Sequence, residues 1–385
     1  MSKKARLIVL VFCLFLAILT PGLVQAQGEL TILDSSAEAV FPSKLNFSLS
    51  AHSNVNITDI RLCYAVDRAS FAQITSEVYV EFTPATTVDV SWALEMLKFG
   101  GLPPGSTVTY WWRVEDASGK EVETAPDQVR YDDTRYLWRS LTEGKVNIYW
   151  YEGDDFFAQE LMSAVQQALE RLAEDTGAHP EKPVELYIYA NANDLKGAMV
   201  YPQEWTGAVT FTRYSIMAFG IAPGETSWGK TAIAHELTHL VIGQMTLNPY
   251  NSPPNWLDEG LATYNENAGL LDPILASYLF KAIAENRLIS VQSLSSPFSA
   301  YADEARLSYA ESYSLVEFLI ASYGQGKMLE LLNAFREGSS YDAALERVYG
   351  FDMDGLDSLW REYVTRQYQS AGVERMHPAL ATAGF

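Results

Sequence analysis

The chain has 385 residues, a length typical of two or three domains with a sizeable buried core. Hydrophobic residues make up 48% of it and charged residues 19%, which excludes general disorder. The 27 Lys and Arg residues stand against 48 Asp and Glu residues, and the resulting formal net charge of -21 repels phosphate backbones, so no nucleic-acid partner is expected.

The first 26 residues have the three-part pattern of a secretory signal peptide. A basic start precedes an apolar run over residues 7–19, and small residues mark an expected cleavage site after Ala26. The run is shorter than the roughly 20 residues that span a bilayer, so we expect a secreted protein without a stable membrane span. The alternative is a membrane anchor formed by an uncleaved N-terminal segment. Cleavage leaves Cys63 as a lone cysteine, without a disulfide in the chain.

Residues 27–134 are expected to form an all-β domain. Short apolar runs alternate with polar residues, and turn residues separate them at fairly even spacing, which is typical of an antiparallel β-sandwich. The four clearest runs are residues 45–49, 60–64, 78–82 and 108–114. The late hairpin pattern of this region resembles an immunoglobulin or fibronectin type III domain, and no chemistry-bearing cluster occurs in it.

Residues 135–370 show a different periodicity, that of an α+β domain that is mostly helical in its second half. A helix capped by Asp154 or Asp155 and closed by Gly177 lies between expected strands. Those strands cover residues 146–150, 184–189, 208–211 and 215–219. Helices follow to about residue 369, and residues 371–385 are expected to be a flexible tail.

One of the expected helices carries a pattern of metal ligands. It starts near Thr226 or Ser227 and ends at Gly243, and it places His235 and His239 four residues apart on one face. Two imidazoles one turn apart can reach the same zinc ion, and Glu236 beside them is offset round the helix, where it can hold a water molecule. Solvated histidines on an ordinary helix are the alternative, but the surrounding residues are apolar.

A catalytic zinc site needs a third protein ligand and an open position. Glu259 lies 20 residues after His239, at the expected start of the next helix. The prolines at positions 249, 253 and 254 turn the chain back between the two helices, so Glu259 can face the histidines. We therefore predict it to be the third ligand.

The His-Glu-x-x-His motif followed by Trp-Leu-x-Glu-Gly-x-Ala at residues 256–262 resembles the gluzincin metallopeptidases. The nearest group is the peptidase MA-like metallohydrolases, which are related to aminopeptidase N and thermolysin. The resemblance implies zinc bound by His235, His239 and Glu259, and a general-base role for Glu236. Glu266 matches a second acidic position that could orient a ligand histidine, with a solvated helix residue as the alternative.

The resemblance also implies a tyrosine that stabilises the oxyanion. Tyr309 is the first candidate. The Lys-Gly pair that relatives have shortly after this tyrosine is Glu-Ser here, so Tyr313, one turn later, is kept as the second candidate. Asp258 stands where relatives often have Asn, a difference expected to matter little.

These patterns predict a secreted zinc metallopeptidase that acts on peptides or proteins. Aminopeptidases of the clan have a Gly-Ala-Met-Glu-Asn strand whose Glu binds the substrate amine, and residues 207–211 lack that Glu. An endopeptidase is therefore favoured over an aminopeptidase. A secreted binding or adhesion protein with a structural or degenerate zinc site is the alternative from another class.

Overall fold

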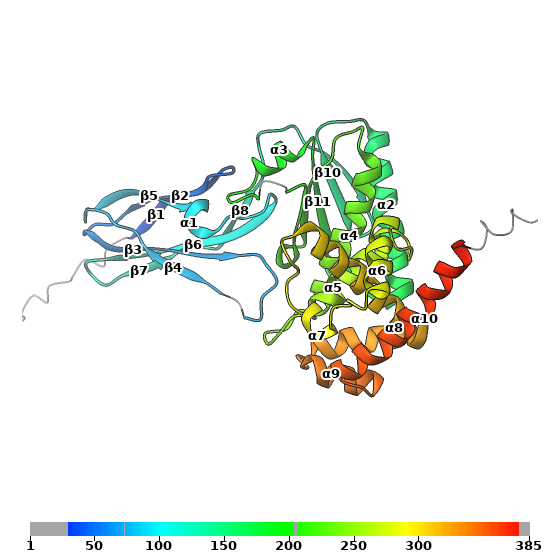
Figure 1. Cartoon of the computed structure of the whole chain (residues 1–385). Helices are drawn as coiled ribbons and strands as arrows, with labels where there is room; N and C mark the ends of the chain where they lie inside the picture. Colours follow the sequence, from blue (N-terminus) through cyan, green and yellow to red (C-terminus); the bar gives the residue numbers. More distant parts are fainter. Residues whose placement is uncertain (1–29, 73, 204–205, 377–385) are drawn as a thin grey trace, which may run out of the picture.

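The structure, a computed structural model, describes residues 30–376 apart from residue 73 and residues 204–205. The expected signal peptide, residues 1–26, lies outside this part of the chain. Figure 1 shows a β-rich N-terminal region at one end of the molecule, and a second region built from a sheet and many helices at the other. None of the described helices has the length and apolar character needed to cross a membrane.

The N-terminal region consists of two antiparallel sheets over one hydrophobic core. The first sheet has the strand order β1 (Thr31–Val40), β2 (Lys44–His52) and β5 (Thr87–Glu95). The second has the order β4 (Ser76–Tyr79), β3 (Ile57–Val66), β6 (Ser106–Asp116) and β7 (Glu121–Glu123), and β8 (Asp127–Tyr131) also pairs with β6. The short helix α1 (Met96–Phe99) follows β5. Buried residues alternate with more exposed ones along β2 and β6, as expected for strands with one face in a core.

The second region is organised around a mixed five-stranded sheet. Its strand order is β12 (Ala208–Phe211), β13 (Ile216–Gly220), β11 (Val184–Tyr189), β10 (Val146–Trp150) and β9 (Arg139–Glu143). Helix α2 (Asp155–Thr176) connects the parallel strands β10 and β11 and has the expected caps, Asp154 at its start and Gly177 at its end. The antiparallel strand β12 lies at the edge of the sheet, and within the described part of the chain no strand pairs with its other side.

The two faces of this sheet belong to different cores. Ile148, Leu186 and Phe219 pack with the helices, whereas Tyr187 and Tyr189 pack in the core of the N-terminal region. The chain passes from one region to the other between β8 and β9. The sheet therefore joins the two regions through a continuous packed interface.

The rest of the chain is helical, as expected. The helices are α3 (Ala192–Lys196), α4 (Thr226–Met245), α5 (Asn255–Glu266), α6 (Pro273–Ala284), α7 (Val291–Leu294), α8 (Ala302–Arg336), α9 (Tyr341–Tyr349) and α10 (Met353–Met376). Helix α8 is kinked at Gly324, whose φ of 80° and ψ of 170° are not helical. Helix α10 continues past residue 370, where the tail was expected to begin, and residues 377–385 lie outside the described part.

The predicted end of helix α4 at Gly243 is wrong. The helix continues to Met245, and Thr246 closes it with a backbone hydrogen bond of 2.8 Å to the carbonyl oxygen of Ile242. A residue larger than glycine would not fit at position 243, because its Cβ atom would lie 2.5 Å from the Cγ2 atom of Thr212. The glycine lets the segment after β12 approach the helix closely.

Candidate metal centre

Helix α4 presents the two histidines on one face. It packs against α2, α5 and β12, and most of its residues from Ile233 onward are buried. The Nε2 atoms of His235 and His239 lie 3.1 Å apart, and each side chain retains about a fifth of its exposure, 20% and 17%. The predicted one-turn spacing therefore brings both ring nitrogens to a single point that solvent can reach.

Glu259 reaches the same point from α5. Its Oε2 atom lies 3.6 Å from Nε2 of His235 and 3.5 Å from Nε2 of His239. The helix begins at Asn255, so Glu259 lies in its second turn and does not open it as expected. Within the described part of the chain, these three residues form the one group of at least three potential ligands that lie close enough to share an ion.

The spacing of the three ligand atoms fits a tetrahedral ion. Bonds of roughly 2.0–2.1 Å in tetrahedral geometry separate neighbouring ligands by about 3.3 Å, and the separations here are 3.1, 3.5 and 3.6 Å. The Oε2 atom of Glu259 is also buried without a hydrogen-bond partner among the described residues. A buried carboxylate oxygen without a partner is costly, and a cation would supply that partner.

Each histidine turns its other ring nitrogen toward a second carboxylate. The Nδ1 atom of His235 lies 2.9 Å from Oε2 of Glu266, and Nδ1 of His239 lies 3.1 Å from Oδ2 of Asp258. The contact of His235 with Glu266 is a hydrogen bond, which orients the imidazole and leaves Nε2 free to bind a metal. The contact of His239 with Asp258 lies at ion-pair distance, but Nδ1 of His239 has no hydrogen-bond partner among the described residues. The role of Asp258 was missed from sequence, where it stood out only as a replacement for Asn.

The carboxylates set the charge of the metal-free centre. Burial disfavours the charged form of His235, but Glu259 and Glu266 outweigh it and raise the pKa of the imidazole to about 9. The pKa of His239 is raised in the same way by Asp258 and Glu259, against its burial. Burial would raise the pKa of Glu259, yet the two histidines lower it to about 2. The centre thus favours positive charge, whether it comes from protons or from a metal ion.

Glu236 contacts strand β12. The hydroxyl of Thr210 donates a hydrogen bond of 2.7 Å to its Oε2 atom and also lies 3.3 Å from its backbone oxygen. Thr210 lies within β12, whose four residues include no acidic one. Its contact with Glu236 was missed from sequence, because no local pattern relates a strand residue to a helix that follows 26 positions later.

The two candidate tyrosines lie in different surroundings on α8. The ring of Tyr309 is 6.5 Å from the ring of His235, and burial together with Glu259 raises the pKa of its hydroxyl to about 12. Tyr313 is 2% exposed, and its hydroxyl donates a 2.7 Å hydrogen bond to the carbonyl oxygen of Gly269. Tyr309 therefore lies beside the candidate metal ligands with a neutral hydroxyl, whereas the hydroxyl of Tyr313 already donates to Gly269.

Close packing of α5 on α8 brings Tyr309 to the centre. A Cβ atom at Gly260 would lie 2.4 Å from the carbonyl oxygen of Ser312, so no larger residue fits there without a shift. On the other side of α5, the amide of Asn265 donates a 2.9 Å hydrogen bond to Thr238 of α4. The three helices that carry the candidate site residues are thus held directly against one another.

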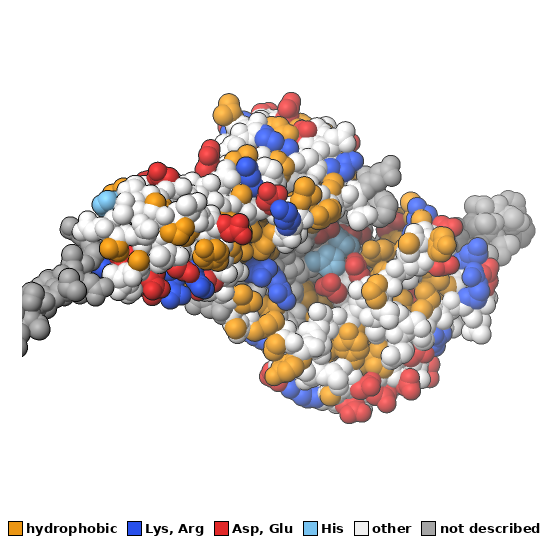
Figure 2. Space-filling model, turned by 90° about the vertical axis from the view of Figure 1, so that its left-hand side faces the viewer, with side chains coloured by type: hydrophobic (Ala, Val, Ile, Leu, Met, Phe, Trp, Pro, Cys, Tyr) orange, Lys and Arg blue, Asp and Glu red, His pale blue; other side chains and the backbone are white. Residues whose placement is uncertain are grey.

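The centre opens to the surface. Figure 2 shows histidine side chains at the bottom of a hollow, with acidic side chains beside them. A cavity of about 280 Å³ adjoins it and is lined by His239 and Asp258 among others.

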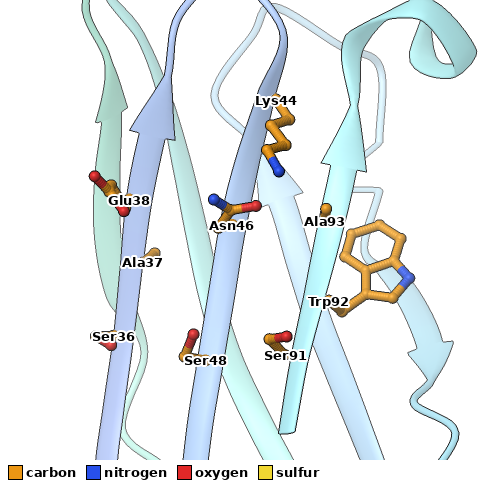
Figure 3. Close-up of a pocket in the computed structure, with 9 residues that line it drawn as sticks. All are labelled: Ser36, Ala37, Glu38, Lys44, Asn46, Ser48, Ser91, Trp92 and Ala93. Carbon is orange, nitrogen blue, oxygen red and sulfur yellow. The ribbon is translucent and has the colours of Figure 1, made fainter.

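A second hollow, of about 550 Å³, lies on the outer face of β1, β2 and β5, where Ser36, Ser48 and Ser91 form a row across the strands (Figure 3). Besides these serines it is lined by Lys44 and Trp92, among others, and it lies far along the chain from His235 and His239.

The sequence profile of the peptidase MA superfamily matches residues 164–366, more than half of the 385 residues. A search of curated protein sequences returned no significant match. A solved structure of a variant M1 zinc metallopeptidase from Deinococcus radiodurans is similar with a TM-score of 0.37 at 12% identity, over 86% of this chain and 94% of that one. An aminopeptidase A from Legionella pneumophila, solved with aspartic acid, is similar with a TM-score of 0.36 at 9% identity, over 86% of this chain and 49% of that one.

Proposed function

The chain belongs to the peptidase MA superfamily, and on that premise we propose that it is a zinc-dependent metallopeptidase that hydrolyses peptide bonds. The observation that carries the proposal is the triangle of His235, His239 and Glu259, whose ligand atoms lie 3.1, 3.5 and 3.6 Å apart. These three residues would hold the zinc ion, and Glu266 and Asp258 would orient the two histidines.

When bound, zinc lowers the pKa of a water molecule and polarises the scissile carbonyl group. Glu236 then acts as the general base. It accepts a proton from the attacking water and returns it to the leaving amine. Thr210 holds one oxygen of Glu236, which leaves the other oxygen free for the proton. The hydroxyl of Tyr309, whose ring lies 6.5 Å from the ring of His235, donates a hydrogen bond to the oxyanion.

An endopeptidase fits this cleft better than an aminopeptidase. The free edge of β12 can pair with an extended peptide that passes Glu236. The strand carries Thr210, and no acidic residue within β12 could bind a substrate amine. We therefore propose peptide bonds within a chain as the substrates.

We further propose that the N-terminal region is an immunoglobulin or fibronectin III-like sandwich and that the protein is secreted. The first proposal is supported by two antiparallel sheets, β1-β2-β5 and β4-β3-β6-β7, over one core. The second rests on the signal-peptide pattern of residues 1–26.

One experiment separates the candidate functions. The purified protein is tested for bound zinc and for cleavage of matched peptides with free and acetylated N-termini. An endopeptidase cleaves both, an aminopeptidase cleaves only the free form, and a binding protein cleaves neither. Removal of zinc by a chelator should abolish cleavage, and added zinc should restore it. The Glu236→Gln variant should retain zinc but lose activity about 100-fold or more; full activity in that variant contradicts the mechanism.

A further inference from the structure

We propose that Arg213 forms an anion-binding subsite beside the metal centre, and that the N-terminal sandwich holds it there. The subsite would select peptides with an acidic residue within about three positions of the bond that is cleaved. This inference rests on the proposed peptidase function and adds a substrate class to it.

The subsite is the cavity of about 280 Å³ that adjoins the candidate metal ligands. Its wall includes His239 and Asp258 from the centre, and Thr212 and Arg213 from the segment after β12. Pockets for drug-sized ligands have roughly 300–1,000 Å³, so this cavity suits one or two side chains of a peptide. It therefore has the size and the place of a pocket for a substrate residue near the scissile bond.

Arg213 lies just beyond the strand along which the substrate peptide is expected to bind. It lies three residues after Thr210, which contacts Glu236, and the short 3-10 turn η1 (Thr212–Tyr214) that contains it directly follows β12. Residues of an extended peptide advance about 3.3 Å each. A peptide paired with the free edge of β12 would thus bring a side chain to Arg213 within a few residues of Glu236.

Arg213 is an exposed cation in a strongly acidic chain, and it forms no ion pair with the described residues. No carboxylate of the described residues lies within 4.0 Å of its guanidinium group, although Asp and Glu outnumber Lys and Arg by 48 to 27. Asp258 lines the same cavity, but its Oδ2 atom already contacts His239 at 3.1 Å. The guanidinium group is thus available for a carboxylate, which it can bind with two parallel hydrogen bonds.

The sandwich contributes directly to this placement. The connection between β3 and β4 projects from the sandwich toward the second region (Figure 1). In it, the backbone N–H of Ala69 donates a 2.6 Å hydrogen bond to the carbonyl oxygen of Arg213. The guanidinium carbon lies 5.9 Å from the ring centroid of Phe71, within cation–π range. Phe71 is therefore a positioning residue for Arg213, and the sandwich shapes the substrate cleft.

The test uses decapeptides with acetylated N-termini and amidated C-termini that are uncharged except for a single Glu, moved from position to position. Each is compared with its Gln and Lys counterparts. The full-length zinc-loaded protein should prefer Glu at one position near the cleaved bond by about tenfold in kcat/KM. The Arg213→Gln variant should bring that ratio close to one, and Arg213→Glu should favour Lys at the same position. Phe71→Ala should reduce the ratio in part, and added salt should reduce it in the unmodified protein.

The Arg347→Gln variant is the matched control, because it removes one exposed arginine that pairs with Glu337 instead; it should keep the preference. Equal cleavage of Glu and Gln peptides by the unmodified protein, or a preference that survives Arg213→Gln, overturns the subsite and leaves the proposed function intact. If no peptide is cleaved, the proposed function fails. Binding of fluorescent forms of the same peptides to the zinc-loaded Glu236→Gln variant then decides the subsite, and absence of a Glu preference there overturns it.

Discussion

The hydroxyl of Thr210 donates a 2.7 Å hydrogen bond to Oε2 of Glu236, across the contact between edge strand β12 and helix α4. This bond ties the candidate general base to the strand along which a peptide is expected to bind. The cleft wall and the catalytic group are thereby positioned by the same contact.

Replacement of Thr210 by Val should therefore slow catalysis and leave the metal in place. The loss of a hydrogen bond to a charged group is worth about 1.5–3 kcal/mol, so we expect kcat to fall about 10- to 100-fold. Kinetic assays with zinc analysis would measure both effects. Thr231→Val is the matched control, because Thr231 lies on α4 but its hydroxyl donates to the carbonyl oxygen of Ser227, at 3.4 Å. Unchanged kcat in Thr210→Val would exclude a role in orienting Glu236.

The two tyrosines should respond differently to loss of their hydroxyls. Tyr309→Phe should lower kcat about 100-fold with little change in stability, because an oxyanion donor acts mainly in the transition state. Tyr313→Phe should lower stability instead, because the carbonyl oxygen of Gly269 loses its 2.7 Å partner. Kinetics and thermal unfolding of both variants test this, and the reverse pattern would assign the oxyanion role to Tyr313.

Glu266 and Asp258 should control metal affinity. Glu266→Gln should weaken zinc binding about 10- to 100-fold, as is usual when the partner of a ligand histidine is changed. Asp258→Asn should have a smaller effect, because its side chain is 36% exposed and solvent weakens the contact with His239. Competition with a chromophoric chelator gives both affinities. Asp272→Asn, at the start of α6, is the control. If the Glu266 and Asp258 variants bound zinc as tightly as this control, neither carboxylate would contribute to metal binding.

The metal-free protein should lose stability as the pH rises. The pKa of His235 is raised from 6.5 to about 9, so its stabilising contribution is fully present below pH 6.5 and is lost as the pH rises through 9. The contribution of Glu259 to stability changes with pH in the opposite direction. Its pKa is lowered from 4.5 to about 2, so this contribution is lost as the pH falls through 2. Denaturant unfolding with excess chelator at pH 6 and pH 9.5 measures the first effect. If the Glu259→Gln variant lost as much stability between pH 6 and pH 9.5 as the unmodified protein, the pairing of His235 with Glu259 would not be the cause.

Gly260→Ala should destabilise the fold and separate α5 from α8. The new Cβ atom would lie 2.4 Å from the backbone oxygen of Ser312, which cannot move aside as a side chain can. Overpacking of this kind costs about 1–3 kcal/mol. Gly326→Ala is the control, because no heavy atom lies within 4 Å of its added Cβ. Thermal unfolding should show a lower Tm only for Gly260→Ala, and equal Tm values would contradict the close contact.

The sequence alone predicted the parts of the site that depend on local geometry. His235 and His239 share a face because the α-helix has a fixed period, and this holds wherever the helix lies. Of the two expected N-caps of α2, Asp154 is the one observed, and the expected end at Gly177 is confirmed, because caps also depend on local geometry. The motif that follows at residues 256–262 pointed to the peptidase family, and the profile match shows that membership.

Only the tertiary structure decided which distant groups meet the helix. Local rules predict that Gly243 ends α4. The helix continues past it, and the glycine at this position is explained by the close approach of Thr212. The contact of Thr210 with Glu236, that of Asp258 with His239, and the packing of Phe71 against Arg213 join residues from different elements. Such pairs have no period in the sequence, because they are set by how the sheet, the helices and the sandwich pack against one another.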